Sequence, residues 1–174
     1  LEEIRGIYFK HRKEIVQNDK REIIKDINSL PSPAYHLLPM NRYYPAAGAC
    51  KRTPAISVLA TRGCPGRCTF CNNMFGSQVR VRSGRLVADE VMYLQDRFGI
   101  KEVCFYDDTF TINHKRLHKL LKGMEELDIQ FLSANRVNLM TRKILRDLRK
   151  AGCVKVAYGI ESGSQKVLDK VNKK

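Results

Sequence analysis

The feature that most constrains the fold is a regular alternation, from Pro54 onward, of short apolar runs with longer amphipathic segments. The short runs are typical of buried strands, and the longer segments keep the helical spacing of their apolar residues. Strands that alternate with helices of this length form right-handed βαβ units around a parallel sheet, so we expect an α/β domain. The expected strands are 55–60, 102–106, 129–133 and 154–158, and the expected helices are about 87–98, 113–127, 141–151 and 164–171.

The four βα units predict an incomplete barrel. Four parallel strands are too few to close a sheet on itself. A dinucleotide-binding sheet would need a glycine-rich phosphate loop after its first strand, and none follows residues 55–60. We therefore expect a partial (β/α) barrel of the TIM type. Chemistry in such folds collects in the loops at the carboxyl ends of the strands, so site residues are expected there.

Residues 1–53 lack this alternation and predict a connector, whereas residues 54–174 predict the core domain. Residues 6–10 and 14–17 can pair as a small hairpin, and the prolines of residues 30–35 favour an extended turn region. The chain begins at a leucine and ends without a helix stop signal. We expect a piece of a longer protein that lacks the last barrel strands and is inactive or unstable on its own.

The formal net charge of +14 is spread along the chain and is not confined to a tail. Spread positive charge favours anionic partners such as nucleic acid, a phosphorylated substrate or an acidic electron donor. A solvated surface that keeps the protein soluble is the simpler explanation. No run approaches the ~20 apolar residues of a membrane span, and no signal peptide is visible, so we expect a cytoplasmic protein with reduced thiols.

The stretch TRGCPGRCTFC, which directly follows the first expected strand, carries the most specific chemistry. Cys64, Cys68 and Cys71 supply three thiols from one short loop, and its glycines let the backbone fold tightly. A structural zinc site closes with four ligands, usually as two separated pairs, and no second pair exists in this sequence. A [4Fe-4S] cluster normally takes four cysteines, so three would leave one iron open to another ligand.

Two other interpretations of this loop stay open on the residues alone. The three thiols can be unligated, or they can hold zinc together with a distant side chain. His114 and His118 are the candidates for that fourth ligand.

The spacing C-x-x-x-C-x-F-C, with Phe70 before the last cysteine, resembles the signature of radical S-adenosylmethionine (SAM) enzymes. The stretches PAISVLATRGCPGRCTFC, EVCFYDDTF, SANRV and AGCVKVAYGIESGSQKVLDKVNK resemble more narrowly those radical SAM enzymes whose full-length forms carry a cobalamin-binding domain. The likeness covers roughly residues 25–174. That subclass includes methyltransferases and anaerobic ring cyclases of the magnesium-protoporphyrin ester type.

The resemblance implies that Cys64, Cys68 and Cys71 hold a [4Fe-4S] cluster whose open iron is chelated by the amine and carboxylate of SAM. One electron then cleaves SAM into methionine and a 5′-deoxyadenosyl radical that abstracts hydrogen from a substrate. Cobalamin would come from a domain outside this chain. An acidic flavodoxin or ferredoxin would supply the electron, which would give the basic surface a purpose.

The resemblance also assigns cofactor contacts to other strand-end loops. Phe70 belongs to the cluster motif, Asp107 or Asp108 would meet the methionyl ammonium in place of the family's common Gly-Gly-Glu, and Glu161 or Ser162 would contact the ribose. Without such roles, these carboxylates can serve the helices that follow them. Further candidates are Asn135 and Arg136 for the cofactor carboxylate or the substrate, and Arg80, Arg82 and Arg85 for anions or a solvated basic face.

The sequence is therefore interpreted as a radical SAM enzyme of the methyltransferase or cyclase type, with no residue assigned a catalytic role. A tRNA-modifying methylthiotransferase is the alternative within this class. A basic nucleic-acid-binding module with a structural metal is the alternative from another class, although no RNA-binding signature interleaves its aromatic and basic residues.

Overall fold

A computed structural model of the chain describes residues 1–43, 45–46 and 48–173, so residues 44, 47 and 174 of the predicted connector and core lie outside the described residues. The central element is a four-stranded parallel sheet in the order β3-β6-β7-β8. This arrangement confirms the α/β class and the four expected strands. The strands are β3 (Ala55–Val58), β6 (Glu102–Phe105), β7 (Gln130–Asn135) and β8 (Cys153–Tyr158).

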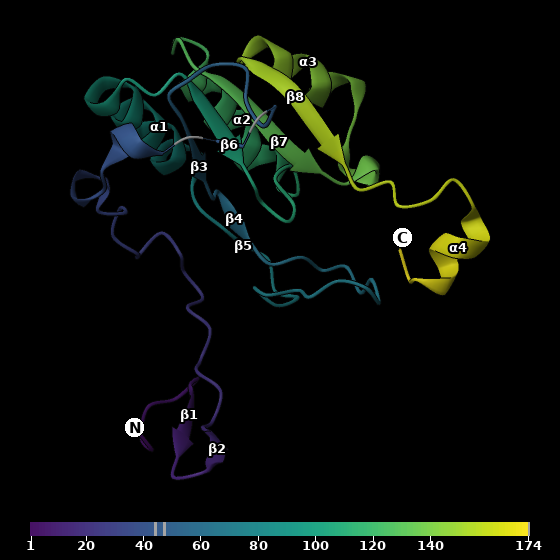
Figure 1. Cartoon of the computed structure of the whole chain (residues 1–174). Coiled ribbons are helices and arrows are strands. Elements are labelled where there is room, and N and C mark those ends of the chain that lie inside the picture. The colour runs from purple at the N-terminus through teal and green to yellow at the C-terminus, as the bar shows by residue number, and fades with distance from the viewer. Residues whose placement is uncertain (44, 47, 174) are drawn as a thin grey trace.

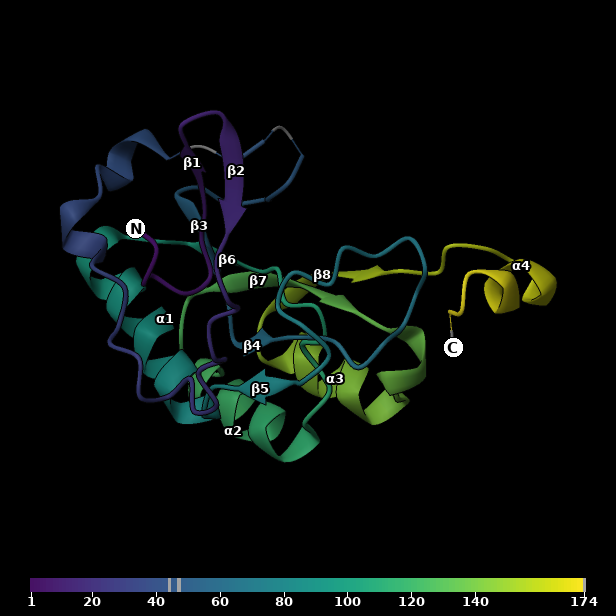
Figure 2. The same cartoon turned by 90° about the horizontal axis from the view of Figure 1, so that it is seen from below.

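Three helices, α1 (Gly84–Phe98), α2 (His114–Met124) and α3 (Arg142–Lys150), cover one face of this sheet (Figures 1 and 2). Each begins after a polar residue whose side chain accepts a hydrogen bond from a backbone N–H three residues further on. The first helix starts three residues earlier than expected because its cap precedes the apolar periodicity. The capping residues are Ser83, Asn113 and Thr141, and the last two stand at the expected starts of their helices.

The hydrophobic core lies between the sheet and these helices, and a cluster of aromatic rings lies at its centre. The ring centroids of Phe105 and Phe110 are 4.7 Å apart, and those of Phe105 and Phe131 are 5.6 Å apart. Gly84 lets α1 approach α2 closely, since a Cβ atom there would lie 2.4 Å from the carbonyl oxygen of Arg116. The core fixes β6 between its neighbours, and with it the loop that follows β6.

A short antiparallel ladder at the carboxyl end of β3 was not predicted. It joins β4 (Thr61–Arg62) to β5 (Arg80–Val81) and so closes the loop that carries the cysteines. Strands of two residues have no periodic signal that a sequence pattern can reveal. The ladder gives the cysteine loop a defined beginning and end.

The segment predicted as a connector has two parts that differ in their packing. Its hairpin, β1 (Tyr8–His11) paired with β2 (Glu14–Gln17), confirms the prediction and lies at the far end of an extended stretch (Figure 1). Ile27 and Tyr35 are buried, and Tyr35 belongs to the core cluster, so the second part packs on the sheet domain. Two 3-10 turns follow, η1 (Tyr35–Leu37) and η2 (Met40–Arg42).

The last element, α4 (Gln165–Lys170), lies beyond the end of β8 and away from the sheet (Figures 1 and 2). It follows Ser164, as predicted, although the Ser164 side chain makes no capping hydrogen bond. None of the helices in the described ranges is long and apolar enough to cross a lipid bilayer.

Candidate functional site

The cysteine loop, residues 63–79, leaves β4 at the carboxyl end of the sheet and returns through β5. The three cysteines expected to bind the cluster all lie on it as free thiols; Cys64 and Cys68 are partly buried and Cys71 is exposed. Phe70, also on the loop, is 56% exposed. The sulfur atoms are therefore accessible to a ligand that approaches the mouth of the partial barrel.

The chemistry of this loop fits an iron–sulfur cluster, although its sulfur atoms are not gathered around one point. Backbone N–H groups already donate to two of them, from Gly66 to Cys64 Sγ and from Asn73 to Cys71 Sγ, both at 3.4 Å. Hydrogen bonds to sulfur are among the means by which proteins set cluster potentials. Among the described residues, no three His, Cys, Asp or Glu side chains are gathered as a ready-made metal site. The loop therefore supplies the three thiol donors.

Arg136, which follows β7, reaches across to the cysteine loop. Its Nη1 atom lies 4.0 Å from Cys64 Sγ. Gly66 makes this approach possible, because a Cβ atom there would lie 2.8 Å from that Nη1 atom. The neighbouring candidate Asn135 is buried, and its side chain donates to Ser133 Oγ at 2.9 Å. Of this pair, Arg136 is the residue that the fold brings to the cysteines.

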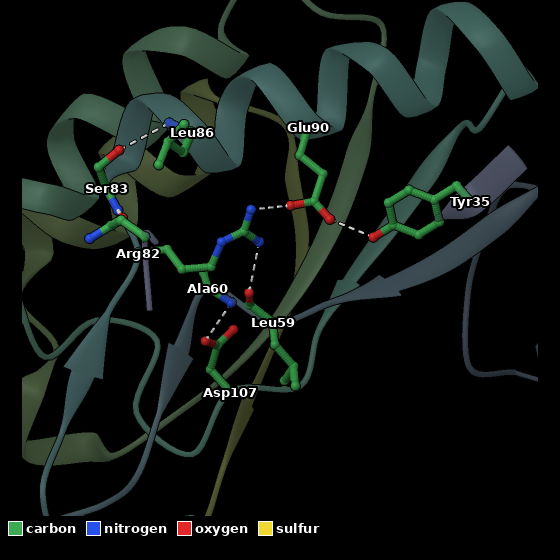
Figure 3. A network of polar contacts seen from close by, with 9 residues as sticks. Tyr35, Leu59, Ala60, Arg82, Ser83, Leu86, Glu90 and Asp107 are labelled. Carbon is green, nitrogen blue, oxygen red and sulfur yellow. Dashed lines mark hydrogen bonds and ion pairs between the residues drawn. The ribbon is translucent and has the colours of Figure 1, made fainter. Parts of the chain in front are cut away.

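The two acidic residues that follow β6 have different environments. Asp107 is buried, and its Oδ1 atom accepts a hydrogen bond from the backbone N–H of Ala60 at 2.9 Å (Figure 3). The same atom also accepts from the backbone N–H of Thr61. Burial raises the pKa of Asp107 to about 6, although these hydrogen bonds and the charge of Arg116 act in the opposite direction.

Asp108, in contrast, is exposed to solvent. Its Oδ2 atom accepts a hydrogen bond from the N–H of Gly63 at 3.2 Å, at the start of the cysteine loop. The next helix is capped by Asn113, so neither aspartate serves as a helix cap. Of the two, Asp108 is the carboxylate that a bound molecule can reach.

The loop after β8 brings its predicted residues to the same end of the sheet. The Oε1 atom of Glu161 accepts a hydrogen bond from Lys173 Nζ at 3.2 Å, and the residue has a φ of 63°. Ser162 lines a cavity of about 300 Å³ together with Arg136 and Ile160. This cavity therefore lies between the ends of β7 and β8, with an arginine at its edge that also reaches the cysteine loop.

Contacts between the cysteine loop and the carboxyl-terminal segment join the first and last strand-end loops. The N–H of Thr69 donates to the carbonyl oxygen of Val171 at 3.0 Å. The side-chain amide of Asn172 donates to the carbonyl oxygen of Arg67 at 3.0 Å. The cysteines, Arg136 and the 300 Å³ cavity consequently belong to one region.

Of the three arginines after the cysteines, two hold the loop instead of facing solvent. The Nη1 atom of Arg82 donates to the carbonyl oxygen of Leu59 at 3.1 Å, and its Nη2 atom forms an ion pair with Glu90 (Figure 3). Arg80 donates to the carbonyl oxygen of Phe75 at 2.8 Å. Only Arg85, paired at 3.8 Å with Asp89 on an exposed helix face, fits the solvated interpretation.

Sequence reasoning missed Glu90 and its second partner, Tyr35, whose hydroxyl donates to Glu90 Oε1 (Figure 3). A signal was present: Glu90 shares the buried face of α1 with Val87 and Val91. A carboxylate on an apolar helix face needs a buried partner. Through Tyr35 and Arg82, Glu90 therefore joins α1 both to the amino-terminal segment and to the residue that follows β5.

Comparison with known proteins identifies the family of this chain. The sequence profile of the Radical SAM superfamily matches residues 58–174. An uncharacterized methyltransferase of Pyrococcus horikoshii is 36% identical over 177 residues, 99% of this chain and 38% of that protein. Cytidylyl-2-hydroxyethylphosphonate methyltransferase of Streptomyces wedmorensis is 29% identical over 157 residues, 86% of this chain and 29% of that protein. The chain thus spans well under half the length of these curated relatives.

Among solved structures, the fold resembles that of TsrM, a radical S-adenosylmethionine methyltransferase from Kitasatospora setae that was determined with cobalamin and a [4Fe-4S] cluster bound. The TM-score is 0.61 at 21% sequence identity, over 67% of this chain and 24% of the TsrM chain. This likeness supports the partial barrel.

Proposed function

The chain belongs to the radical SAM superfamily, and from this premise we propose that Cys64, Cys68 and Cys71 bind a [4Fe-4S] cluster with one iron left for SAM. The observation that carries the proposal is the set of three free thiols on one loop at the carboxyl end of β3, inside the matched region. Three thiolates leave a cubane cluster with one open coordination position. The amine and carboxylate of SAM would occupy it.

When bound, such a cluster supplies one electron to the sulfonium of SAM, which divides into methionine and a 5′-deoxyadenosyl radical. The chain's own residues bind and orient the nucleoside. Asp108 is exposed beside the cysteine loop and suits the methionyl ammonium, and Ser162 lines the 300 Å³ cavity and suits the ribose. Glu161 and Phe70 are exposed near these positions and complete the proposed cofactor contacts.

We further propose that the whole protein transfers a methyl group and uses cobalamin held by a domain outside residues 1–174. The names of the Pyrococcus and Streptomyces relatives support methyl transfer over ring cyclisation or methylthiolation, and TsrM supports cobalamin. The net charge of +14 suits an acidic flavodoxin or ferredoxin as the electron donor. The cytoplasm, where thiols stay reduced, is the proposed compartment.

Anaerobic reconstitution of the full-length protein with iron and sulfide tests the proposal. We expect about four irons and four sulfides per chain, an electron paramagnetic resonance (EPR) spectrum of the reduced cluster that changes when SAM is added, and release of 5′-deoxyadenosine. Cys71→Ala should lose the cluster, whereas Cys153→Ala, outside the loop, should keep it. Zinc in place of iron, or equal iron in both variants, would contradict the proposal.

A further inference from the structure

Three consecutive residues after β6 contact the backbone from which the cysteine loop begins. Asp107 Oδ1 accepts from the N–H groups of Ala60 and Thr61, and Asp108 Oδ2 accepts from the N–H of Gly63 at 3.2 Å. The Thr109 hydroxyl donates to the carbonyl oxygen of Gly63 at 3.3 Å. The side chains that follow β6 therefore make the hydrogen bonds that a neighbouring strand would otherwise make with residues 60–63, the segment that follows β3.

The reason for this arrangement lies in the sheet. The parallel ladder between β3 and β6 ends with the pair Val58 and Phe105, so Ala60 and Thr61 lie beyond the last ladder partner. Both are buried, with 0% and 1% of their surface exposed. Buried N–H groups without an acceptor cost free energy, and the carboxylate of Asp107, two residues past Phe105, accepts from both.

The position of Asp107 does not suit a contact with SAM. Its carboxylate points toward the backbone N–H of Ala60, as Figure 3 shows, and only 3% of the residue is exposed. The charge that acts on it comes from Arg116, which is itself buried and donates to the carbonyl oxygen of Phe110. A ligand at the mouth of the barrel would meet Asp108 instead.

We propose that Asp107 is a positioning residue which, together with Thr109, fixes the amino-terminal arm of the cysteine loop so that Cys64 is presented for metal binding. This inference rests on the proposed function of the loop. It separates the acidic pair into two roles: Asp107 holds the protein backbone, and Asp108 is left for the cofactor. The feature that Asp107 must supply is an acceptor oxygen at Oδ1, and its negative charge is not required for the contact.

The two substitutions Asp107→Asn and Asp107→Ala in the full-length protein test this assignment, with the exposed Asp96→Ala on α1 as a matched control. Asparagine keeps an acceptor oxygen for both N–H groups and removes the charge, whereas alanine removes the acceptor. In cluster-free protein, we expect the amides of Ala60 and Thr61 to exchange with solvent about tenfold faster or more in Asp107→Ala than in wild type. Asp107→Asn should exchange within roughly twofold of wild type.

After reconstitution, Asp107→Ala should hold less than about half the wild-type iron, whereas Asp107→Asn should hold wild-type iron and bind SAM within roughly twofold of the wild-type affinity. If the asparagine variant keeps its iron but binds SAM at least about tenfold more weakly, the carboxylate contacts the ammonium and the inference is overturned. Wild-type exchange and iron in Asp107→Ala would also overturn it.

Failure of the proposed function gives a different result. If wild-type protein takes up no iron, the cluster proposal falls, but the exchange measurement on cluster-free protein still decides whether Asp107 holds residues 60 and 61. Should Asp107→Ala fail to fold by circular dichroism, Thr109→Val provides the decision, because it removes only the hydroxyl donated to Gly63. That variant should expose the Gly63 segment to faster exchange and lower the iron content, and wild-type values would count against the inference.

Discussion

The base and the tip of the cysteine loop differ in how firmly the rest of the protein holds them. The base, residues 60–63 and 80–82, is paired in the β4–β5 ladder and tied to Asp107, Glu90 and the carbonyl of Leu59. The tip, residues 64–74, carries the three cysteines and is largely exposed, with Phe70 and Met74 at 56% and 78%. Contacts with the rest of the chain therefore hold the base of the loop, whereas the part that carries the cysteines is mostly exposed.

Because of this difference, substitutions can change the stability of the protein and its metal content separately. Substitutions in the base remove buried contacts, so they should lower the free energy of unfolding of the cluster-free protein. Substitutions in the tip remove sulfur ligands but few contacts, so they should change metal content alone. The expected loss of stability is therefore largest at the buried ion pair of the base and smallest at the cysteines.

Arg82→Ala should have the largest effect. The Glu90 side chain is 4% exposed, and without Arg82 it would be a buried carboxylate with no cation beside it. Breaking a buried pair in this way costs about 3–5 kcal/mol. Urea unfolding of the cluster-free protein measures the loss, and Arg85→Ala, whose ion pair is exposed, should stay within about 0.5 kcal/mol of wild type. Equal stability of the two variants would show that Arg82 is not part of a structural base.

Gly63→Ala should be the next most destabilising change. Gly63 has a φ of 91°, and a Cβ atom there would lie 2.4 Å from the carbonyl oxygen of Gln78, across the neck of the loop. Backbone strain and overpacking together should cost about 2–4 kcal/mol.

Gly48→Ala is the matched control for that variant, because Gly48 also has a positive φ, of 75°, but among the described residues beyond its chain neighbours no atom lies within 4 Å of the added Cβ. It should cost only the conformational part, about 1–2 kcal/mol. The difference between the melting temperatures of Gly63→Ala and Gly48→Ala measures the effect of the close approach between residue 63 and the carbonyl oxygen of Gln78. No difference would indicate that the loop can open at its base.

Tyr35→Phe should have a smaller effect and tests whether the connector belongs to the base. The hydroxyl of Tyr35 donates to Glu90, and burial raises the pKa of this phenol. Loss of that hydrogen bond should cost about 1–2 kcal/mol, since Glu90 keeps Arg82 as a partner. Tyr8→Phe, in the exposed hairpin, should leave the unfolding midpoint unchanged. If Tyr35→Phe and Tyr8→Phe left the stability equally unchanged, the contact of Tyr35 with Glu90 would not contribute to the base of the loop.

The contrast between base and tip also explains what the sequence could predict. Periodicity and caps located the four strands and the helices after Asn113 and Thr141, because local chemistry determines them. The spacing of the cysteines located the tip. The base could not be predicted, because Asp107, Glu90 and Tyr35 acquire their roles from contacts 46 to 55 residues apart in the chain. Only the polar residue on the buried face of α1 hinted at such a contact.

The smallest loss of stability is expected at the tip, with Cys68→Ala. Cys68 is partly buried, and the N–H of Cys71 donates to its carbonyl oxygen, a backbone contact that alanine preserves. Unfolding of the cluster-free protein should stay within about 0.5 kcal/mol of wild type. Iron bound after anaerobic reconstitution should nevertheless fall to background, because two thiolates and an open loop cannot retain the cluster.

Two other outcomes for Cys68→Ala would revise the comparison in different directions. Wild-type iron in the variant would mean that the cluster is held by a different set of ligands, and the assignment of the tip would fail. A loss of stability like that of Gly63→Ala would mean that the tip packs as firmly as the base before metal binds. Unchanged stability with no iron is the expected pair of results, because the contacts of the base do not involve Cys68, whereas its thiol is one of the three proposed ligands.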